Sequence, residues 1–473
     1  MSETFDAVVV GSGPNGLAAA ITLAQAGHSV QVIEGEPTIG GGLRTAELTL
    51  PGFHHDICSA IHPLALASPF LASLPLADHG LEMLQPPLAA AHPLEQFPGV
   101  ALKRSVDETA ELLGEDAAAY RSLMAPLVRD SSKLVEQFLG PLRPPRHPLA
   151  AARFGVYAAL PATLLAKRFQ GEGARALFAG CAAHAILPLS RPPTAGFGLL
   201  MGLLGHSAGW PAAKGGSQSI AGALRSILES LGGQIEVGHK IDSIDELPAH
   251  KVALLDIGPR ELIRITGDRL PDLYKKMLRR YRYGPGVFKV DWALDGPVPW
   301  KDPACSSAGT VHLGGTLEEI AASEKMLWKG RHADQPYVIV VQQSIVDDSR
   351  APEGKHTLWA YCHVPNGSTV DRTDAIESQI ERSAPGFKDL ILGKSTMDTR
   401  EFERHNSNYV GGDINGGIQD LFQLFTRPVP RLDPYSTPLD GVYLCSASTP
   451  PGGGVHGMCG HFAARSALKH MKD

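Results

Sequence analysis

A glycine-rich turn directly after a run of valines constrains this chain more than any other feature. Residues 5–10 (FDAVVV) are apolar and β-branched, as in a buried parallel strand. The next six residues fit the pattern GxGxxG, and the sequence predicts an alanine-rich helix from there to Gly27. The residues of the turn are Gly11, Ser12, Gly13, Pro14, Asn15 and Gly16.

Each glycine of this turn has a distinct physical role in a dinucleotide site. Gly11 makes the tight turn, Gly13 lets a pyrophosphate touch the backbone, and Gly16 lets the helix pack on the strand. The helix N-terminus adds about half a positive charge facing the phosphates. The sequence therefore predicts a strand-turn-helix unit that binds a dinucleotide.

A second predicted strand, residues 29–34 (SVQVIE), ends in an acid. Glu34 stands at its carboxyl end, where a carboxylate accepts hydrogen bonds from a ribose diol. The same charge repels a 2′-phosphate. FAD or NAD is therefore expected, and NADP is not.

A second glycine-rich turn follows the acid, in residues 35–48 (GEPTIGGGLRTAEL), and Arg44 can reach the same pyrophosphate. This arrangement resembles the extended FAD signature shared by flavin amine oxidases and phytoene dehydrogenases, and it favours FAD over NAD. The resemblance implies cofactor contacts by Gly35, Gly41, Gly42, Leu43 and Arg44.

The segment 437–471 reads as a strand, a loop rich in proline and glycine, and a helix. Residues 452–457 also match GxGxxG, but no second strand with a terminal acid follows, so no separate NAD domain is expected. In phytoene dehydrogenase-like proteins this segment returns to the first domain, and the helix N-terminus would stabilise the negative charge of a reduced flavin. The resemblance implies that Ser446, Gly454, Val455, His456 and Met458 bind the cofactor.

The same resemblance implies the domain organisation. The fold class is α/β, with a Rossmann-type FAD-binding domain of the glutathione-reductase-like kind and an inserted α+β substrate domain. Residues 1–75, 212–275 and 430–473 would form the discontinuous FAD domain, in which Ile241 lies by the adenine. Residues 76–211 and 276–429 would form the substrate domain.

Composition excludes some partners. The 43 basic and 49 acidic residues give a formal charge of −6 without a basic block, which argues against a nucleic-acid partner. The six cysteines show neither CxxC nor zinc spacing, and the histidines show no metal motif, so no metal is expected. Reduced thiols, the absence of a signal-like N-terminus and the absence of an apolar run of membrane length predict a cytoplasmic protein.

The segment between Glu136 and Glu172 contains basic residues and no acidic residue. Its many Ala, Leu and Pro residues predict either a core helix pair with solvated ends or an amphipathic basic surface that lies on an anionic bilayer. The second interpretation would make the protein peripheral to a membrane. The basic residues are Arg143, Arg146, Arg153, Lys167 and Arg168.

Three further side chains are candidates for catalysis. Residues 286–294 (GVFKVDWAL) alternate like a strand and resemble the strand of flavin amine oxidases whose lysine holds a water at flavin N5; Lys289 is the matching position, and a solvated strand lysine is the alternative. Tyr409 and Asp413 stand among glycines that allow close approach to a ring system, or that simply shape a loop.

The resemblance implies an FAD-dependent dehydrogenase or desaturase that takes hydride from a C–H bond of an apolar, isoprenoid or lipid-like substrate, with oxygen or a quinone as electron acceptor. A flavin amine oxidase is the alternative enzyme, favoured by Lys289 and by Tyr409 as one wall of an aromatic cage. A non-catalytic flavin-binding interaction protein and a redox-neutral isomerase that uses reduced FAD also remain open. The sequence carries no signal for the oligomeric state.

Overall fold

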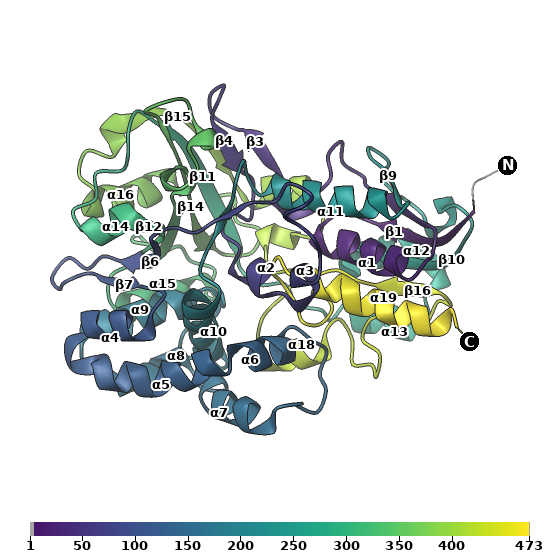
Figure 1. The fold of residues 1–473 in the computed structure, drawn as a ribbon, viewed down its shortest axis with the longest axis horizontal. Coiled ribbons are helices and arrows are strands. Elements are labelled where there is room, and N and C mark those ends of the chain that lie inside the picture. The colour runs from purple at the N-terminus through teal and green to yellow at the C-terminus, as the bar shows by residue number, and fades with distance from the viewer. Residues whose placement is uncertain (1–3, 473) are drawn as a thin grey trace.

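The computed structural model describes residues 4–472, and Figure 1 shows them arranged around two sheets that lie side by side. The first sheet has five parallel strands in the order β16-β10-β1-β2-β9. Its strands are β1 (Phe5–Val10), β2 (Val30–Ile33), β9 (Gln234–Glu236), β10 (His250–Leu255) and β16 (Val442–Leu444). Strand β1 thus lies between β2 from the start of the chain and β10 from the middle, and the edge strands β9 and β16 come from the middle and the end.

Two helices from opposite ends of the chain pack against each other on this sheet, as Figure 1 shows. A Cβ atom on Gly460 would overlap the carbonyl oxygen of Asn15, so glycine at this position lets the two backbones touch. The helices are α1 (Pro14–Gln25) and α19 (Met458–His470). The other helices of this part are α11 (Gln218–Ser230), α12 (Pro259–Thr266) and α13 (Asp272–Leu278).

The second sheet has seven strands in the order β15-β11-β14-β13-β12-β6-β7. All neighbouring pairs are antiparallel except β12 and β6. Its strands are β6 (Leu88–His92), β7 (Val100–Leu102), β11 (Gly286–Leu294), β12 (Ala308–Leu313), β13 (Val338–Val341), β14 (His356–Val364) and β15 (Ile391–Met397). The short pairs β3 (Thr45–Glu47) with β4 (His54–Asp56), and β5 (Met83–Leu84) with β8 (Ala212–Ala213), are separate.

The two faces of the second sheet have different partners. The predicted alternation in β11 is observed, since Phe288, Val290 and Trp292 enter an apolar core, which they share with α16 (Thr373–Ser383) and α14 (Pro303–Ser307). The opposite face is covered by helices that include α9 (Glu172–Ala183) and α15 (Leu317–Leu327). Helix α10 (Thr194–Ser207) is apolar and packs on α9. The remaining helices are α2 (Pro63–Ala67), α3 (Pro69–Ala72), α4 (Val106–Leu112), α5 (Ala117–Arg129), α6 (Ser131–Phe138), α7 (Pro148–Ala158), α8 (Ala162–Leu165), α17 (Thr399–His405) and α18 (Leu421–Thr426).

These features confirm the α/β fold class with a Rossmann-type domain. The five parallel strands fall within the three segments that the sequence assigns to the FAD domain, while the exact domain boundaries stay a prediction. Helix α7 is mostly exposed, with only Ala150 and Phe154 buried, so it is not a core helix.

No single helix among residues 4–472 is long and apolar enough to cross a membrane. By length and composition alone, one pair of helices among the described residues would together be long and apolar enough, Pro148–Ala158 with Ala162–Arg168. The chain bends by 94° at the break between these two helices.

We expect the substitution Gly460→Ala to destabilise the protein, because the new Cβ would meet backbone that cannot rotate away. A loss of about 1–3 kcal/mol in the free energy of unfolding is expected from overpacking of this kind, measured by urea titration. Gly222→Ala in α11 is the matched control, because nothing lies within 4 Å of its new Cβ. That variant should be as stable as the parent or more stable. Equal stability of the two variants would contradict the close contact between α1 and α19.

Candidate active site

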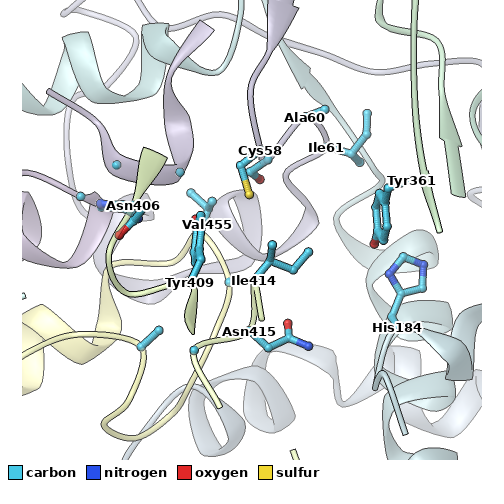
Figure 2. Close-up of a pocket in the computed structure, with 18 of the residues that line it drawn as sticks. Cys58, Ala60, Ile61, His184, Tyr361, Asn406, Tyr409, Ile414, Asn415 and Val455 are labelled. Carbon is cyan, nitrogen blue, oxygen red and sulfur yellow. The ribbon is translucent and has the colours of Figure 1, made fainter. Parts of the chain in front are cut away.

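A cavity of about 270 Å³ lies between the dinucleotide turn and the second sheet. Figure 2 shows side chains from distant parts of the chain pointing into it. One side is built from backbone-rich turns that the sequence assigns to the cofactor. These lining residues are Gly13, Pro14, Asn15, Gly41, Gly42, Gly454 and Val455.

The opposite side is the face of the second sheet that points away from the core of Phe288, Val290 and Trp292. The strand register places Trp359 of β14 beside Val341 of β13, and Tyr361 beside Ile339. Thr310 of β12 is paired with Val341 in the same row. All five of these residues line the cavity. The same side also includes His184 after α9, Met201 of α10, Trp210, residues 58–61 and residue 63, so it is mostly apolar. The cavity is also lined by Asn406, Asn408 and Asn415.

The two glycine turns lie against each other. A Cβ on Gly41 would come within 3.1 Å of the Gly13 Cα atom, so both turns present bare backbone to the same space. Next to them, the side-chain oxygen of Asn15 is buried without a hydrogen-bond partner among the described residues. A backbone cradle at the N-terminus of α1 fits the pyrophosphate of FAD, whereas the free Asn15 oxygen, which can only accept, fits a hydroxyl of the cofactor and not a phosphate.

Glu34 takes up the predicted position at the end of β2. Its carboxylate accepts hydrogen bonds from the Ser12 backbone N–H at 2.8 Å and from the Ser12 hydroxyl at 2.5 Å. The Arg44 guanidinium lies 3.5 Å from the same carboxylate and donates to the His405 carbonyl oxygen. Neither Glu34 nor Arg44 is a cavity-lining residue. The structure therefore shows them fixing the turns that would hold a cofactor, and their direct contact with it stays a prediction.

Residues from the end of the chain complete the cradle. Gly454 and Val455 line the cavity, whereas the His456 ring lies behind them and accepts a hydrogen bond at 3.0 Å from the Met458 N–H. One of the helix N–H groups that the resemblance assigns to the flavin is thus already paired within the chain. Ser446 donates to the Ile257 carbonyl oxygen beside the cavity.

Five predicted cofactor positions are found in the packing around the turns rather than in the cavity wall. Gly11 and Gly16 hold the turn together, because a Cβ on Gly16 would overlap the Gly11 carbonyl oxygen. Leu43 is in the main apolar core, and Ile241 is buried in the cluster behind the first sheet. Gly35 lies beside Lys240, whose Cα would be 3.4 Å from an added Cβ.

Lys289 is fully buried, which excludes the solvated alternative. Its ammonium donates to the Asp291 carboxylate at 2.5 Å and to the Asp56 carbonyl oxygen at 2.9 Å. Lys289 does not line the cavity, but its nitrogen lies 5.6 Å from the centre of the Trp359 ring, which does. Lys289 thus lies next to a cavity-lining ring, that of Trp359, without lining the cavity itself. Its predicted role of holding a water at the flavin stays a prediction.

Tyr409 lines the cavity, and its ring stands upright in the middle of Figure 2. Its hydroxyl is hydrogen bonded to the Cys58 thiol, and burial raises the pKa of both groups, so both stay protonated. A Cβ on Gly42 would overlap the same hydroxyl. Asp413 is buried outside the cavity wall and accepts from the Gly284 N–H at 2.6 Å, so it shapes the loop whose next residue, Ile414, lines the cavity.

Asp256 is a lining residue that the sequence analysis missed. Its carboxylate accepts a hydrogen bond at 2.9 Å from the Gly16 N–H and faces the phosphate cradle from the end of β10. Burial raises the pKa of Asp256 to about 7, and the Glu34 carboxylate adds to this, while the Gly16 N–H opposes it. The sequence signal that could have identified Asp256 is an acid at the carboxyl end of a predicted buried strand, and in the structure this acid lies next to the glycine turn.

The polar residues of the sheet wall were also missed. Thr310 and Tyr361 come from segments without a motif, and only the pairing of β12, β13 and β14 brings them to one face, while His184 reaches the cavity from the end of α9.

Comparison with known proteins finds similarity both in the first part of the chain and over its full length. A family model described as an NAD(P)-binding Rossmann-like domain matches residues 9–70. The chain is 26% identical over 562 residues to pyridine nucleotide-disulfide oxidoreductase domain-containing protein 2 of Rattus norvegicus, covering 100% of this chain and 95% of the relative. It is 22% identical over 506 residues to a 4,4′-diapophytoene desaturase of a Methylomonas species, covering 96% and 93% of the two chains.

Solved structures show the same fold. An oxidoreductase from Methanosarcina mazei matches with a TM-score of 0.66 at 16% identity, covering 98% of this chain and 99% of the other. Cyclohexylamine oxidase from Brevibacterium oxydans matches with a TM-score of 0.61 at 16% identity and covers both chains fully.

We expect FAD to bind more weakly as the pH rises through about 7, the pKa of Asp256. Below that pH the carboxyl is neutral, and above it a negative charge faces the pyrophosphate, which should raise the dissociation constant by about tenfold. Fluorescence titration of FAD at about pH 6 and about pH 8.5 measures this change. Asp256→Asn should remove most of the pH dependence, whereas Asp440→Asn, at an exposed acid, should keep it. An equally steep dependence in Asp256→Asn would contradict the assignment.

The cradle, the acid at the end of β2 and the return of the chain end to the first sheet fit FAD, and the relatives support the same cofactor. The chain therefore resembles FAD-type oxidoreductases: its sequence is similar to desaturases and its fold to an amine oxidase, and the expected resemblance to the phytoene dehydrogenase-related family is confirmed.

Proposed function

We propose that this protein is an FAD-dependent dehydrogenase or desaturase that removes hydride from a C–H bond of a lipid-like substrate. The observation that carries the proposal is the character of the cavity wall opposite the cradle, where Ile339, Val341 and Trp359 form an apolar surface. Among the described lining residues there is no lysine or arginine, and the single carboxylate belongs to Asp256 at the cradle. Such a wall favours a substrate that is recognised by apolar area.

FAD, when bound, would supply the hydride acceptor, with oxygen or a quinone as the proposed oxidant that returns it to the starting state. The chain's own residues hold and shield the reactants. Backbone around Gly13 and Gly41 holds the cofactor, and Tyr409 and Ile414 narrow the space between the cradle and the sheet wall. Trp359 and Met201 exclude water from an apolar chain laid against them.

A flavin amine oxidase is the second candidate. It is favoured by the aromatic rings of Tyr409, Trp359 and Tyr361 in one cavity, and by the fold that this chain shares with cyclohexylamine oxidase. A cationic amine, however, finds no carboxylate on the sheet side of the cavity wall among the described residues. An amine would therefore have to enter in its neutral form, at a cost that an isoprenoid does not have.

We expect the FAD-loaded protein to lose its visible flavin absorbance when mixed without oxygen with an isoprenoid hydrocarbon such as phytoene in detergent micelles. Putrescine and cyclohexylamine should leave the absorbance unchanged, because the sheet wall offers them no counter-charge. A matched variant, Val341→Asp, places a carboxylate in this wall and should slow reduction by the hydrocarbon at least about tenfold. Stopped-flow absorbance measures each rate.

Rapid bleaching by amines alone would favour the amine oxidase over the desaturase. A flavin that no substrate reduces, and that is reoxidised by neither oxygen nor quinones after photoreduction, would favour a non-catalytic FAD-binding protein and would overturn the proposal.

We also propose that helices α7 and α8 contact an anionic bilayer, from which a lipid-like substrate would come. Leu149 is 82% exposed and Val156 is 68% exposed, so α7 presents apolar side chains to its surroundings. Arg146, Arg153 and Lys167 lie on the same segment. Apolar tips flanked by basic residues are typical of a surface that binds anionic lipid.

We expect the double variant Leu149→Asp with Val156→Asp to lose binding to vesicles that contain phosphatidylserine, by at least about tenfold in a co-sedimentation assay. Leu273→Asp is the control, since Leu273 is similarly exposed, at 72%, but lies on α13 of the other part. Equal binding of all three proteins would show that α7 is not the contact surface.

A further inference from the structure

Three histidines, of which His92 and His312 are fully buried, lie in a row at the sheet side of the cavity. His184 follows α9 and lines the cavity; its Nε2 atom lies 3.1 Å from Nε2 of His312 on β12. The next ring, His92 at the end of β6, has its centre 6.4 Å from that of His312. A Cβ on Gly180 would lie 2.7 Å from His312 Nδ1 and 3.1 Å from His92 Nδ1, so these two nitrogens face the same small space beside α9.

The hydrogen bond of His92, at the far end of the row, determines which ring nitrogens carry protons. His92 Nε2 lies 2.7 Å from the Gly315 carbonyl oxygen, which can only accept, so this nitrogen carries the proton. Burial lowers the pKa of His92 to about 4, and the ring is neutral at ordinary pH. His92 Nδ1 therefore has a lone pair, and it has no hydrogen-bond partner among residues 4–472.

Only one placement of the protons on His184 and His312 avoids two lone pairs that face each other. If His312 donated to His184, its own Nδ1 would be a second lone pair facing that of His92 in a space without another partner for either. If His184 Nε2 donates instead, His312 Nδ1 carries a proton that faces the His92 lone pair. The second arrangement is electrostatically favourable in a buried site. It leaves Nδ1 of His184 as a bare acceptor.

That acceptor faces the cavity together with a hydroxyl. Figure 2 shows the His184 ring with one nitrogen on the cavity side and the Tyr361 hydroxyl pointing toward the same region. The side chains of His184 and Tyr361 both line the cavity. Within residues 4–472, the Tyr361 hydroxyl has no hydrogen-bond partner. Burial raises the pKa of Tyr361, so its hydroxyl keeps its proton and can donate. Burial lowers the pKa of His184 to about 3, so its ring stays neutral.

The backbone beside His184 is strained, which is a separate sign of a functional position. Ile186 has a φ of 51°, and it is the one described residue other than glycine with a positive φ. A β-branched side chain in this conformation is unfavourable, and such strain clusters at ligand-binding sites. Here it sits two residues after the histidine that ends α9.

From these observations we infer a polar subsite in the cavity wall, where His184 Nδ1 accepts the proton of a substrate hydroxyl and the Tyr361 hydroxyl donates to the oxygen of that group. The substrate class that this subsite favours is an apolar molecule that carries one hydroxyl, which would bind more tightly than a pure hydrocarbon such as phytoene. The inference rests on the proposed function for the use of this cavity as the substrate site. An ammonium ion would not satisfy the Tyr361 donor, and a carboxylate would face the lone pair of His184.

The test compares farnesol with farnesyl methyl ether, whose oxygen accepts a hydrogen bond but cannot donate one. Binding is measured by calorimetry on the FAD-loaded protein, kept reduced under argon so that no oxidation of the probe accompanies binding. We expect farnesol to bind at least about tenfold more tightly, since the ether leaves His184 Nδ1 unpaired. His184→Leu should abolish this preference by weakening farnesol alone. Tyr361→Phe should weaken both probes alike, because its hydroxyl donates to either oxygen.

A surface histidine supplies the control, and nuclear magnetic resonance supplies a second measurement. His79→Leu, at a position that is not part of the cavity wall, should keep the preference for farnesol. Nitrogen chemical shifts of labelled histidine should show His184 with the proton on Nε2 in the parent protein. Equal binding of the two probes, or a proton on His184 Nδ1, would overturn the inference and leave the proposed function standing. Binding of neither probe would overturn both.

Discussion

Backbone contact between the first and last helices is the constraint on which the site depends. Because Gly460 has no side chain, α19 approaches the carbonyl oxygen of Asn15, and the loop before α19 is carried to the glycine turn before α1. Gly454 and Gly13 thereby line one cavity although they are separated by most of the chain. A larger residue at this contact would move a whole wall of the cofactor site.

A buried ion-pair network links this cradle to the second sheet. Asp56 on β4 accepts from Arg350 at 2.8 Å, with both side chains fully buried, and Arg350 also binds Asp347 at 2.8 Å. Burial alone would raise the pKa of Asp56, but the adjacent guanidinium holds it below its usual value. The Asp56 carbonyl oxygen also accepts from Lys289. Removing one partner would leave an uncompensated charge, so the network fixes how the hairpin of β3 and β4 meets the sheet.

The fold and half of the site follow from local patterns in the sequence. The turn at Gly11 to Gly16, the acid at Glu34 and the return of the chain end each have a spacing that one physical requirement explains. The sheet wall has no such signature. Thr310 and Tyr361 share one face only because strands β12, β13 and β14 pair in one register, and His184 joins them from the end of α9; both arrangements depend on contacts between residues far apart in the chain. Lys289 shows the same limit, since strand alternation places it on one face with Asp291 but does not predict that the pair is buried.

The neutral histidines in and behind the cavity wall affect which molecules the cavity can bind. Burial keeps the pKa of His184 near 3 and that of His312 well below its usual value, so no cation forms here at physiological pH. Among the described lining residues there is also no lysine or arginine. Free fatty acids and phosphorylated lipids would therefore shed their hydration without meeting a counter-ion, and the cavity sorts uncharged molecules from anionic ones before any chemistry begins.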